Sequence, residues 1–466
     1  FFKQKTAYEI KECDWSSDVC SSDLGSSWSK AARPIMKNRN LLLIFSGTLV
    51  VVLLANGLEF GSRDRAITYS YQAVVCPKGE SGTNLTYSLP NKNILIRGVG
   101  SKKVKLFKAG RTVINSTSPA AFIESKGVSI TGWVTKSGSW AGGVLCTAPR
   151  DSQWFAGGVS DISGRGRIIL VNSGLSPATV EIDALSDNQG LIKKTLNVKS
   201  NSISEIGLVS LTPGATATAF RISLLTGRVS AFLIDERGKG LSTFGGDVVN
   251  GQTDLATELV IPVIPVDSNT KLPATLRVGN PSSSDATISA RLISKDGNFV
   301  PVGLGEVKVP AGRAANFDIP ITQPSKQFGL RITSSKPIVA SVYNVSTIKG
   351  RRDFVWSSAA TELKKGQWAV SGIAGKLVIA GEKINVYLEV TTSKQKVIKR
   401  KIIGNDIATW NLPADAKLLE IRGAGGGNFG ALIVSGQGGS GVIPLIPGST
   451  LTKSSVPAAN IGVLNP

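Results

Sequence analysis

The residue types that most often carry out catalysis are scarce in this sequence of 466 residues. It contains no histidine, which excludes the Ser-His-Asp triad, the Cys-His pair and every zinc site that includes histidine. Carboxylate pairs can hydrolyse glycosides without histidine, but Asp235 and Glu236 are adjacent in an expected strand and would face opposite sides. Asp161, Asp183 and Asp187 lack the spacing of a calcium loop. We therefore predict no catalytic residue, no metal ligand and no cofactor.

Three basic clusters are the candidate binding residues. They could hold an anionic polymer, although charged side chains beside strands also protect sheet edges from aggregation. Edge protection is the favoured interpretation, with polyanion binding as the alternative. The clusters are Lys102, Lys103, Lys105, Lys108 and Arg111; Lys349, Arg351 and Arg352; and Lys394, Lys396, Lys399, Arg400 and Lys401.

Aromatic and glycine-rich segments offer weaker signals. Trp133, Trp140 and Trp154 could line a sugar-binding surface, but such residues more often pack in the core of a β-sandwich. The glycine-rich runs 423–427 and 436–441 are not followed by the Lys-Ser/Thr pair and helix of a phosphate-binding loop. We expect them to form hairpin turns or mobile loops.

The N-terminal segment combines a foreign stretch with an export signal. Residues 1–24 match, in frame and in order, the translation of a sequencing-library primer (Lys3–Ile10) and a read adapter (Asp14–Leu24), so they are excluded as an artefact. Residues 25–40 form a basic flank that contains Met36, the single methionine and a candidate initiator. The apolar segment 41–58 follows. Because Lys and Arg remain cytoplasmic, we predict a single-pass signal anchor with the N-terminus inside; the alternative is a secreted protein cleaved after Gly57.

Removing residues 1–24 leaves two cysteines and a strongly basic chain. The formal net charge rises from +21 to +23, because the excluded segment carries three lysines and five acids. This charge predicts anionic envelope polymers or lipid headgroups as neighbours; the alternative is a solvated surface that only keeps the protein soluble. No nucleic acid is expected. Cys76 and Cys146 are an even pair in an exported chain, which predicts a disulfide. Closing a loop of about 70 residues would stabilise the fold by ~4 kcal/mol; free thiols and an intermolecular bond are the alternatives.

An internal repeat organises the exported body. Asn172 aligns with Asn280 at an offset of 108 residues, and Arg221 aligns with Arg331 at an offset of 110. Short alternating runs bounded by turn residues predict strands throughout. We therefore predict an all-β fold of three or four tandem Ig-like β-sandwich units after one transmembrane helix, with a β-propeller as the alternative. The units span residues 66–150 (with the disulfide), 154–250, 255–362 and 366–448, followed by a tail at 449–466.

The order of these features resembles a known family. A basic flank, a single anchor, Cys76-Pro77, and the block from Cys146 through Pro149 to Trp154–Gly158 are similar to actinobacterial membrane-anchored exoproteins of unknown function. The resemblance covers roughly residues 36–445 and implies a surface or envelope setting. It implies no activity, substrate or catalytic residue.

These observations lead to one functional prediction and one alternative. We expect a non-enzymatic, membrane-anchored extracytoplasmic protein that serves as an envelope scaffold or binding module for anionic wall polymers or another envelope protein. The alternative is a histidine-free glycoside hydrolase, or a sugar-binding protein, that depends on carboxylates.

Overall fold

Strands make up almost all regular secondary structure in the computed structural model, which confirms the predicted all-β class. Among the described residues, one 3-10 turn, η1 (Leu208–Ser210), accompanies them. The structure describes residues 67–69, 73–79, 83–89, 93–107, 113–116, 120–136, 140–239, 242–266, 273–321, 327–348, 351–370, 372, 375–436, 439–448 and 454–456. Within these ranges no helix is long and apolar enough to span a bilayer. The predicted artefact, basic flank and anchor at residues 1–58 lie outside the described residues.

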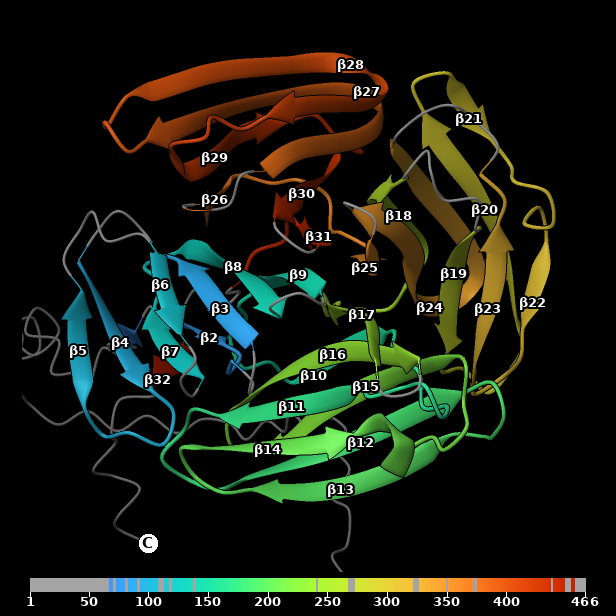
Figure 1. Ribbon diagram of the computed structural model, residues 1–466, viewed down its shortest axis with the longest axis horizontal. Coiled ribbons are helices and arrows are strands. Elements are labelled where there is room, and N and C mark those ends of the chain that lie inside the picture. Colours follow the sequence, from blue (N-terminus) through green and yellow to red (C-terminus); the bar gives the residue numbers. More distant parts are fainter. Residues whose placement is uncertain are drawn as a thin grey trace, which may run out of the picture. The chain divides into compact units, whose positions relative to one another are not determined.

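The first and second sets of strands each form two groups of four paired strands, and one group of the first set is part of a ten-stranded sheet. In the first set the orders are β2-β7-β4-β5 and β6-β3-β8-β9; in the second they are β10-β15-β12-β13 and β14-β11-β16-β17 (Figure 1). The bounds in the first set are β2 (Ala73–Cys76), β3 (Thr83–Ser88), β4 (Ile94–Gly98), β5 (Val104–Phe107), β6 (Val113–Ser116), β7 (Ala121–Glu124), β8 (Val128–Lys136) and β9 (Trp140–Leu145). Those in the second are β10 (Ser152–Ala156), β11 (Arg167–Asn172), β12 (Ala178–Ser186), β13 (Ile192–Val198), β14 (Ser202–Gly207), β15 (Thr218–Thr226), β16 (Val229–Lys239) and β17 (Ser242–Val249).

The third and fourth sets repeat this pairing with longer strands. The bounds in the third are β18 (Ala256–Pro265), β19 (Ala274–Asn280), β20 (Ala286–Ser294), β21 (Gly297–Phe299), β22 (Val307–Val309), β23 (Arg313–Ile319), β24 (Gln327–Ile348) and β25 (Arg351–Ser358). Those in the fourth are β26 (Gly366–Ala369), β27 (Gly375–Thr392), β28 (Val397–Asn411), β29 (Ala416–Ala424), β30 (Phe429–Gly436) and β31 (Gly439–Pro444). The first half of β24 pairs with β18 and β20, and its second half pairs with β19 and β25. β24 thus follows the course that β15 and β16 take as two strands.

A buried asparagine ends the equivalent strands β11 and β19. The Asn172 side-chain amide donates to the carbonyls of Ser176 and Val198, at 2.9 and 3.1 Å. The Asn280 amide donates to Ser284 and Val309, at 2.9 and 3.0 Å. Each side-chain oxygen also accepts a backbone N–H two residues further on. The same local structure therefore follows the same strand in both sets.

Alternation of apolar and polar residues explains how each pair of sheets encloses a core. β12 buries Ala178, Val180 and Ile182, while Thr179 and Glu181 are partly exposed. Successive side chains of a strand point to opposite faces, so each sheet has one apolar face. In the second set, Val180 and Ile182 of one sheet join Ile168 of the other in a single hydrophobic cluster.

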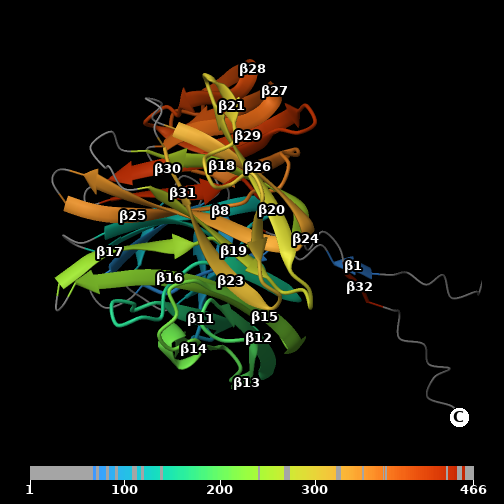
Figure 2. The same cartoon turned by 90° about the vertical axis from the view of Figure 1, so that its right-hand side faces the viewer.

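The last strands of the four sets contact one another. β9 contacts β17 and β31, and β25 contacts the same two strands (Figure 1). β26 also pairs in parallel with β8, which joins the fourth set to the first in one sheet. Residues Thr68–Val456 form one compact unit; the other unit, Phe1–Ile67 and Pro457–Pro466, lies outside the described residues except for Ile67. The short strands β1 (Ile67–Tyr69) and β32 (Ser454–Val456) pair as a separate sheet (Figure 2).

Glycines permit the close approach of these last strands. A Cβ atom on Gly246 of β17 would lie 2.7 Å from the Trp140 ring of β9, and one on Gly441 of β31 would overlap the backbone of Gly143. The expectation that the 436–441 run forms a turn or mobile loop is therefore wrong for Gly439 and Gly441, which belong to the buried strand β31. A glycine run next to a turn looks the same in sequence whether it bends the chain or admits a neighbouring strand.

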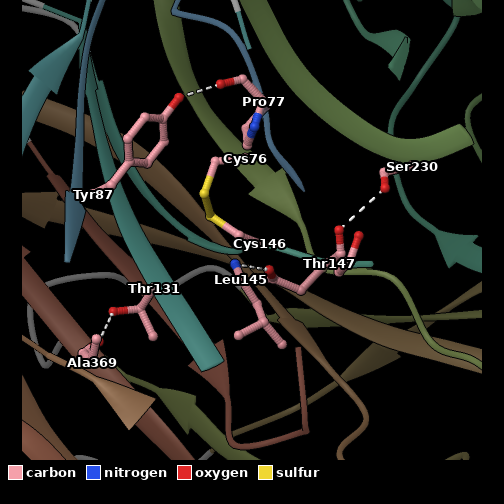
Figure 3. Close-up of a disulfide and its surroundings, with 10 residues drawn as sticks. Cys76, Pro77, Tyr87, Thr131, Leu145, Cys146, Thr147, Ser230 and Ala369 are labelled. Carbon is pink, nitrogen blue, oxygen red and sulfur yellow. Dashed lines mark hydrogen bonds between the residues drawn. A yellow bond between two sulfur atoms is a disulfide. The ribbon is translucent and has the colours of Figure 1, made fainter. Parts of the chain in front are cut away.

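The predicted disulfide between Cys76 and Cys146 is present (Figure 3). It is buried, and it links the end of β2 in one sheet to the residue after β9 in the other. Nearby, the Tyr87 hydroxyl donates to the Pro77 carbonyl. The Thr131 hydroxyl donates to the Ala369 carbonyl at 2.6 Å. The disulfide therefore joins the two sheets of the first set, close to the place where the first set contacts the fourth.

Candidate binding groove

The outer face of the sheet β2-β7-β4-β5 carries exposed apolar side chains. β4 buries Ile94 and Ile96 and turns Leu95 outward, where it is 44% exposed. On the neighbouring edge strand β5, Leu106 pairs with Leu95 and is 61% exposed, and Val104 is 55% exposed. The same strand geometry that fills the core thus leaves an apolar surface on the other side.

Arg97 joins this face to loops of the second set of strands. Its guanidinium donates to the Asn201 side-chain oxygen at 2.8 Å and to the Ser173 carbonyl at 2.6 Å. The guanidinium carbon lies 5.5 Å from the centre of the Phe122 ring, which is within the range of a cation–π contact. Asn201 has a φ of 48° and also accepts the Gly100 backbone N–H. These contacts hold the loops at residues 173–175 and 200–201 against the sheet.

A groove of about 850 Å³ lies between this sheet and the two loops. Leu95, Val104 and Phe122 line it from the sheet, and Leu175, which is 86% exposed, lines it from the opposite loop. Among the described residues, its charged lining consists of Arg97, Lys102, Arg228 and Glu124. Such a size falls within the range of small-molecule sites. Three cations and one acid give the groove a net positive charge.

The predicted basic residues are distributed over different parts of the protein. Lys102 lines the groove, and Lys103 and Lys105 are exposed but do not line it. In the fourth set Lys399, Arg400 and Lys401 are exposed on β28, where Lys399 lies 3.8 Å from the Glu389 carboxylate. Arg352 is exposed and lies over the Phe244 ring. Lys108, Arg111 and Lys349 lie outside the described residues, and Arg351 is described only as part of strand β25.

Sequence reasoning missed Arg97, Arg228 and the apolar lining of the groove. Arg97 and Arg228 stand alone in the sequence among apolar or small residues, so they do not form a charge cluster. Leu95 and Val104 look like ordinary strand residues. The alternation of Ile94, Leu95 and Ile96 gives no indication of which apolar residue faces solvent.

Sequence reasoning also missed two buried carboxyls where the last strands meet. Asp247 of β17 accepts the backbone N–H groups of Trp356 at 2.8 Å and Val248 at 2.7 Å. Asp353 of β25 accepts those of Gly246 at 3.1 Å and Ala141 at 3.3 Å. Ala141 belongs to β9, an edge strand that pairs with β8 on its other side. The carboxyls therefore satisfy donors that the meeting of strand edges would otherwise bury without a partner.

Burial changes the ionisation of these groups. It raises the pKa of Asp353 to about 8. Burial also raises the pKa of Asp247 well above its usual range, against backbone N–H groups that lower it, and the neighbouring Asp353 adds to the rise. Arg277 is also buried. Its burial and, to a lesser degree, the positive charge of the nearby Arg237 lower the pKa of its guanidinium to about 9. These side chains are enclosed by the strands, so we assign them a role in stability.

The remaining candidates for chemistry are structural. Trp140 and Trp154 are buried, and Trp133 packs partly buried against the core of the fourth set. This confirms that the core interpretation was correct for these residues. Asp235 accepts bonds from Arg237 and from the Trp356 indole N–H at 2.9 Å. Its neighbour Glu236 pairs instead with Lys136. In the described part of the chain, no group of three or more acidic or cysteine side chains is placed to hold a metal ion.

Fold and groove together define an all-β protein with a cationic, partly apolar groove. The chain belongs to the family of unknown function DUF5719, whose model matches residues 119–400. The match agrees with the expectation of an uncharacterised family. No curated protein matches the chain.

Solved structures resemble the chain only distantly. Trypsin-activated alpha-2-macroglobulin from Escherichia coli is 10% identical over 81% of this chain, with a TM-score of 0.14. The chain spans 32% of that protein's length. A tetra-tandem repeat from the extending region of a large adhesion protein is 11% identical, covers 80% of this chain and 99% of its own, and has a TM-score of 0.11.

Proposed function

We propose that this protein is a non-enzymatic, membrane-anchored extracytoplasmic binding module that holds an anionic component of the cell envelope. The observation that carries the proposal is the groove, whose lining includes Arg97, Lys102 and Arg228 but a single acid, Glu124. Arg and Lys bind phosphate and carboxylate groups by charge-assisted hydrogen bonds. The buried disulfide supports an extracytoplasmic setting, because such bonds persist in oxidising compartments.

We further propose that the four sets of strands are tandem β-sandwich units of the Ig-like type. Support comes from the pairing order, which is the same in all four sets once the long strands β24, β27 and β28 are divided between two sheets. The equivalent contacts of Asn172 and Asn280 support the same interpretation. Close contacts between successive units would then hold the groove open at a fixed width.

The alternative of glycoside hydrolysis finds little support in this groove. Such chemistry needs two carboxyl groups about 5–10 Å apart across a substrate site, and Glu124 is the sole carboxylate in the described lining. The carboxyls of Asp247 and Asp353 lie close to one another but are fully buried. We propose a role in binding and no catalytic step.

Retention of the protein on an immobilised polyanion tests the proposed function. The purified chain is passed over immobilised polyphosphate at low and high salt, together with the double variant Lys102→Ala/Arg228→Ala. Lys308→Ala removes a cation that is also exposed, on β22, and serves as the control. We expect retention at low salt to fall roughly tenfold in the double variant, as two charge contacts are lost, and to remain unchanged in the control. Equal retention of all three proteins would contradict the proposal.

A further inference from the structure

The outer faces of the second and fourth units carry ion pairs, whereas the groove of the first unit is lined by exposed apolar side chains. In the second unit the equivalent face carries Glu181, Asp183 and Lys193, with the Lys193 ammonium 3.1 Å from Asp183. In the fourth, Arg422 lies 2.9 Å from Glu389. Ion pairs therefore place polar groups on those surfaces, although Tyr387, Val397 and Ile403 of the fourth unit are also 39%, 47% and 68% exposed.

In the first unit the corresponding positions are apolar and exposed. Leu95, Val104 and Leu106 are 44%, 55% and 61% exposed, and Leu175 faces the same groove. A groove that bound polymer through charge alone would gain nothing from this surface. Contiguous exposed apolar area next to polar groups is typical of a surface that binds an apolar ligand.

The charges lie towards one end of this surface. Arg97 pairs with Val104 and Phe122, close to the β4–β5 loop that carries Lys102. Arg228 lies beside Gly174, next to the Ser173 carbonyl that Arg97 binds. Glu124 pairs with Ala73 towards the other end, where Leu95 and Leu106 lie. The groove is therefore cationic at one end and apolar with one acid at the other.

Two of the cations are available to a ligand. Arg97 uses both terminal nitrogens on Asn201 and Ser173, so it serves mainly as part of the wall. Lys102 and Arg228 are exposed. Neither has a carboxylate within ion-pair distance among the residues that the structure describes. An anion at this end would meet both charges without breaking a contact of the protein.

We infer that the groove binds a single-chain lipid with an anionic head group, which extends the proposed function by naming its ligand class. The head group lies at Lys102 and Arg228, and the acyl chain lies over Leu95, Val104 and Phe122. Charge complementarity selects the head group, and burial of apolar surface retains the chain. This inference rests on the proposed function, because it uses the same cations.

Three probes separate the contributions of head and chain. Calorimetric titration of the whole chain uses a lysophosphatidic acid below its micelle concentration, glycerol phosphate (the same head without the chain), and a monoacylglycerol (the same chain without the phosphate). We expect the lysophosphatidic acid to bind at least tenfold more tightly than either fragment. Leu95→Gln/Val104→Thr should weaken it about tenfold, as should Lys102→Ala/Arg228→Ala. Ile403→Gln, which replaces an apolar residue 68% exposed on β28, should leave it unchanged.

The outcomes distinguish this inference from the proposed function. If polyphosphate retention needs Lys102 and Arg228 but the lysophosphatidic acid binds no better than glycerol phosphate, the lipid inference is overturned and the proposed function stands. Unchanged lipid binding in Leu95→Gln/Val104→Thr also overturns it. If neither polyphosphate nor the lipid depends on Lys102 and Arg228, both proposals fail. All substituted side chains are exposed or at the groove surface, and circular dichroism checks that each variant is folded.

Discussion

Replacing Asp353 tests the role of the buried carboxyls in holding the last strands together. Asp353 is fully buried and accepts the N–H groups of Gly246 and Ala141 from two other sets of strands. Asp353→Ala leaves both donors buried without an acceptor. At ~1–3 kcal/mol for each unsatisfied donor, the variant should lose about 2–6 kcal/mol of unfolding free energy. Urea unfolding followed by tryptophan fluorescence measures this loss.

The pH dependence provides the sharper test. Because the folded pKa of Asp353 is about 8 and an unfolded aspartate titrates near ~3.9, the folded state retains a proton that the unfolded state has lost. The unfolding free energy therefore decreases as pH rises between those two values, by up to ~1.4 kcal/mol per pH unit from this group. Asp247, whose pKa burial also raises, contributes with the same sign.

The variant Asp353→Asn removes the titratable carboxyl group while keeping the size of the side chain. Its unfolding free energy should fall less steeply with pH than that of the wild type between about pH 5 and pH 7.5. Asp151→Asn, which changes an exposed aspartate, serves as the control and should keep the wild-type slope. If Asp353→Asn and the wild type show the same slope, Asp353 is ionised in the folded protein and the reasoning about burial is wrong.

Three further predictions concern stability. Reduction of the buried Cys76–Cys146 bond, with a sequence separation of 70, should lower the unfolding free energy by ~4 kcal/mol in denaturant titrations; an unchanged midpoint would contradict this. Gly246→Val should disrupt the contact with Trp140, 2.7 Å from the new Cβ, and lower the melting temperature, whereas Gly303→Val, at a position with open space around it, should cost less and mainly through its backbone strain. Asn172→Ala and Asn280→Ala should each cost ~1–3 kcal/mol; a large effect in one and none in the other would argue against equivalent roles.

Local sequence signals predicted the all-β class and the core, but they did not predict the groove. The all-β class and the disulfide followed from local signals: alternation with a period of two, turn residues, and an even pair of cysteines. The burial of Trp140 and Trp154 was expected because aromatic side chains more often pack in the core of a β-sandwich. The basic clusters were visible as runs of charge, but of the described members only Lys102 lines the groove.

The sequence by itself determined the all-β class and which cysteines pair, because these properties depend on neighbours along the chain and on the small number of thiols. Only the tertiary structure decided which apolar face stays exposed, where isolated cations such as Arg97 and Arg228 meet, and which carboxyls are buried. These features arise where segments far apart in the chain come together: Arg97 with Asn201, Asp353 with Ala141, and Gly441 with Gly143. Strand periodicity distinguishes the two faces of a strand but does not show what each face packs against. The groove and the buried carboxyls therefore become visible only in the packed structure.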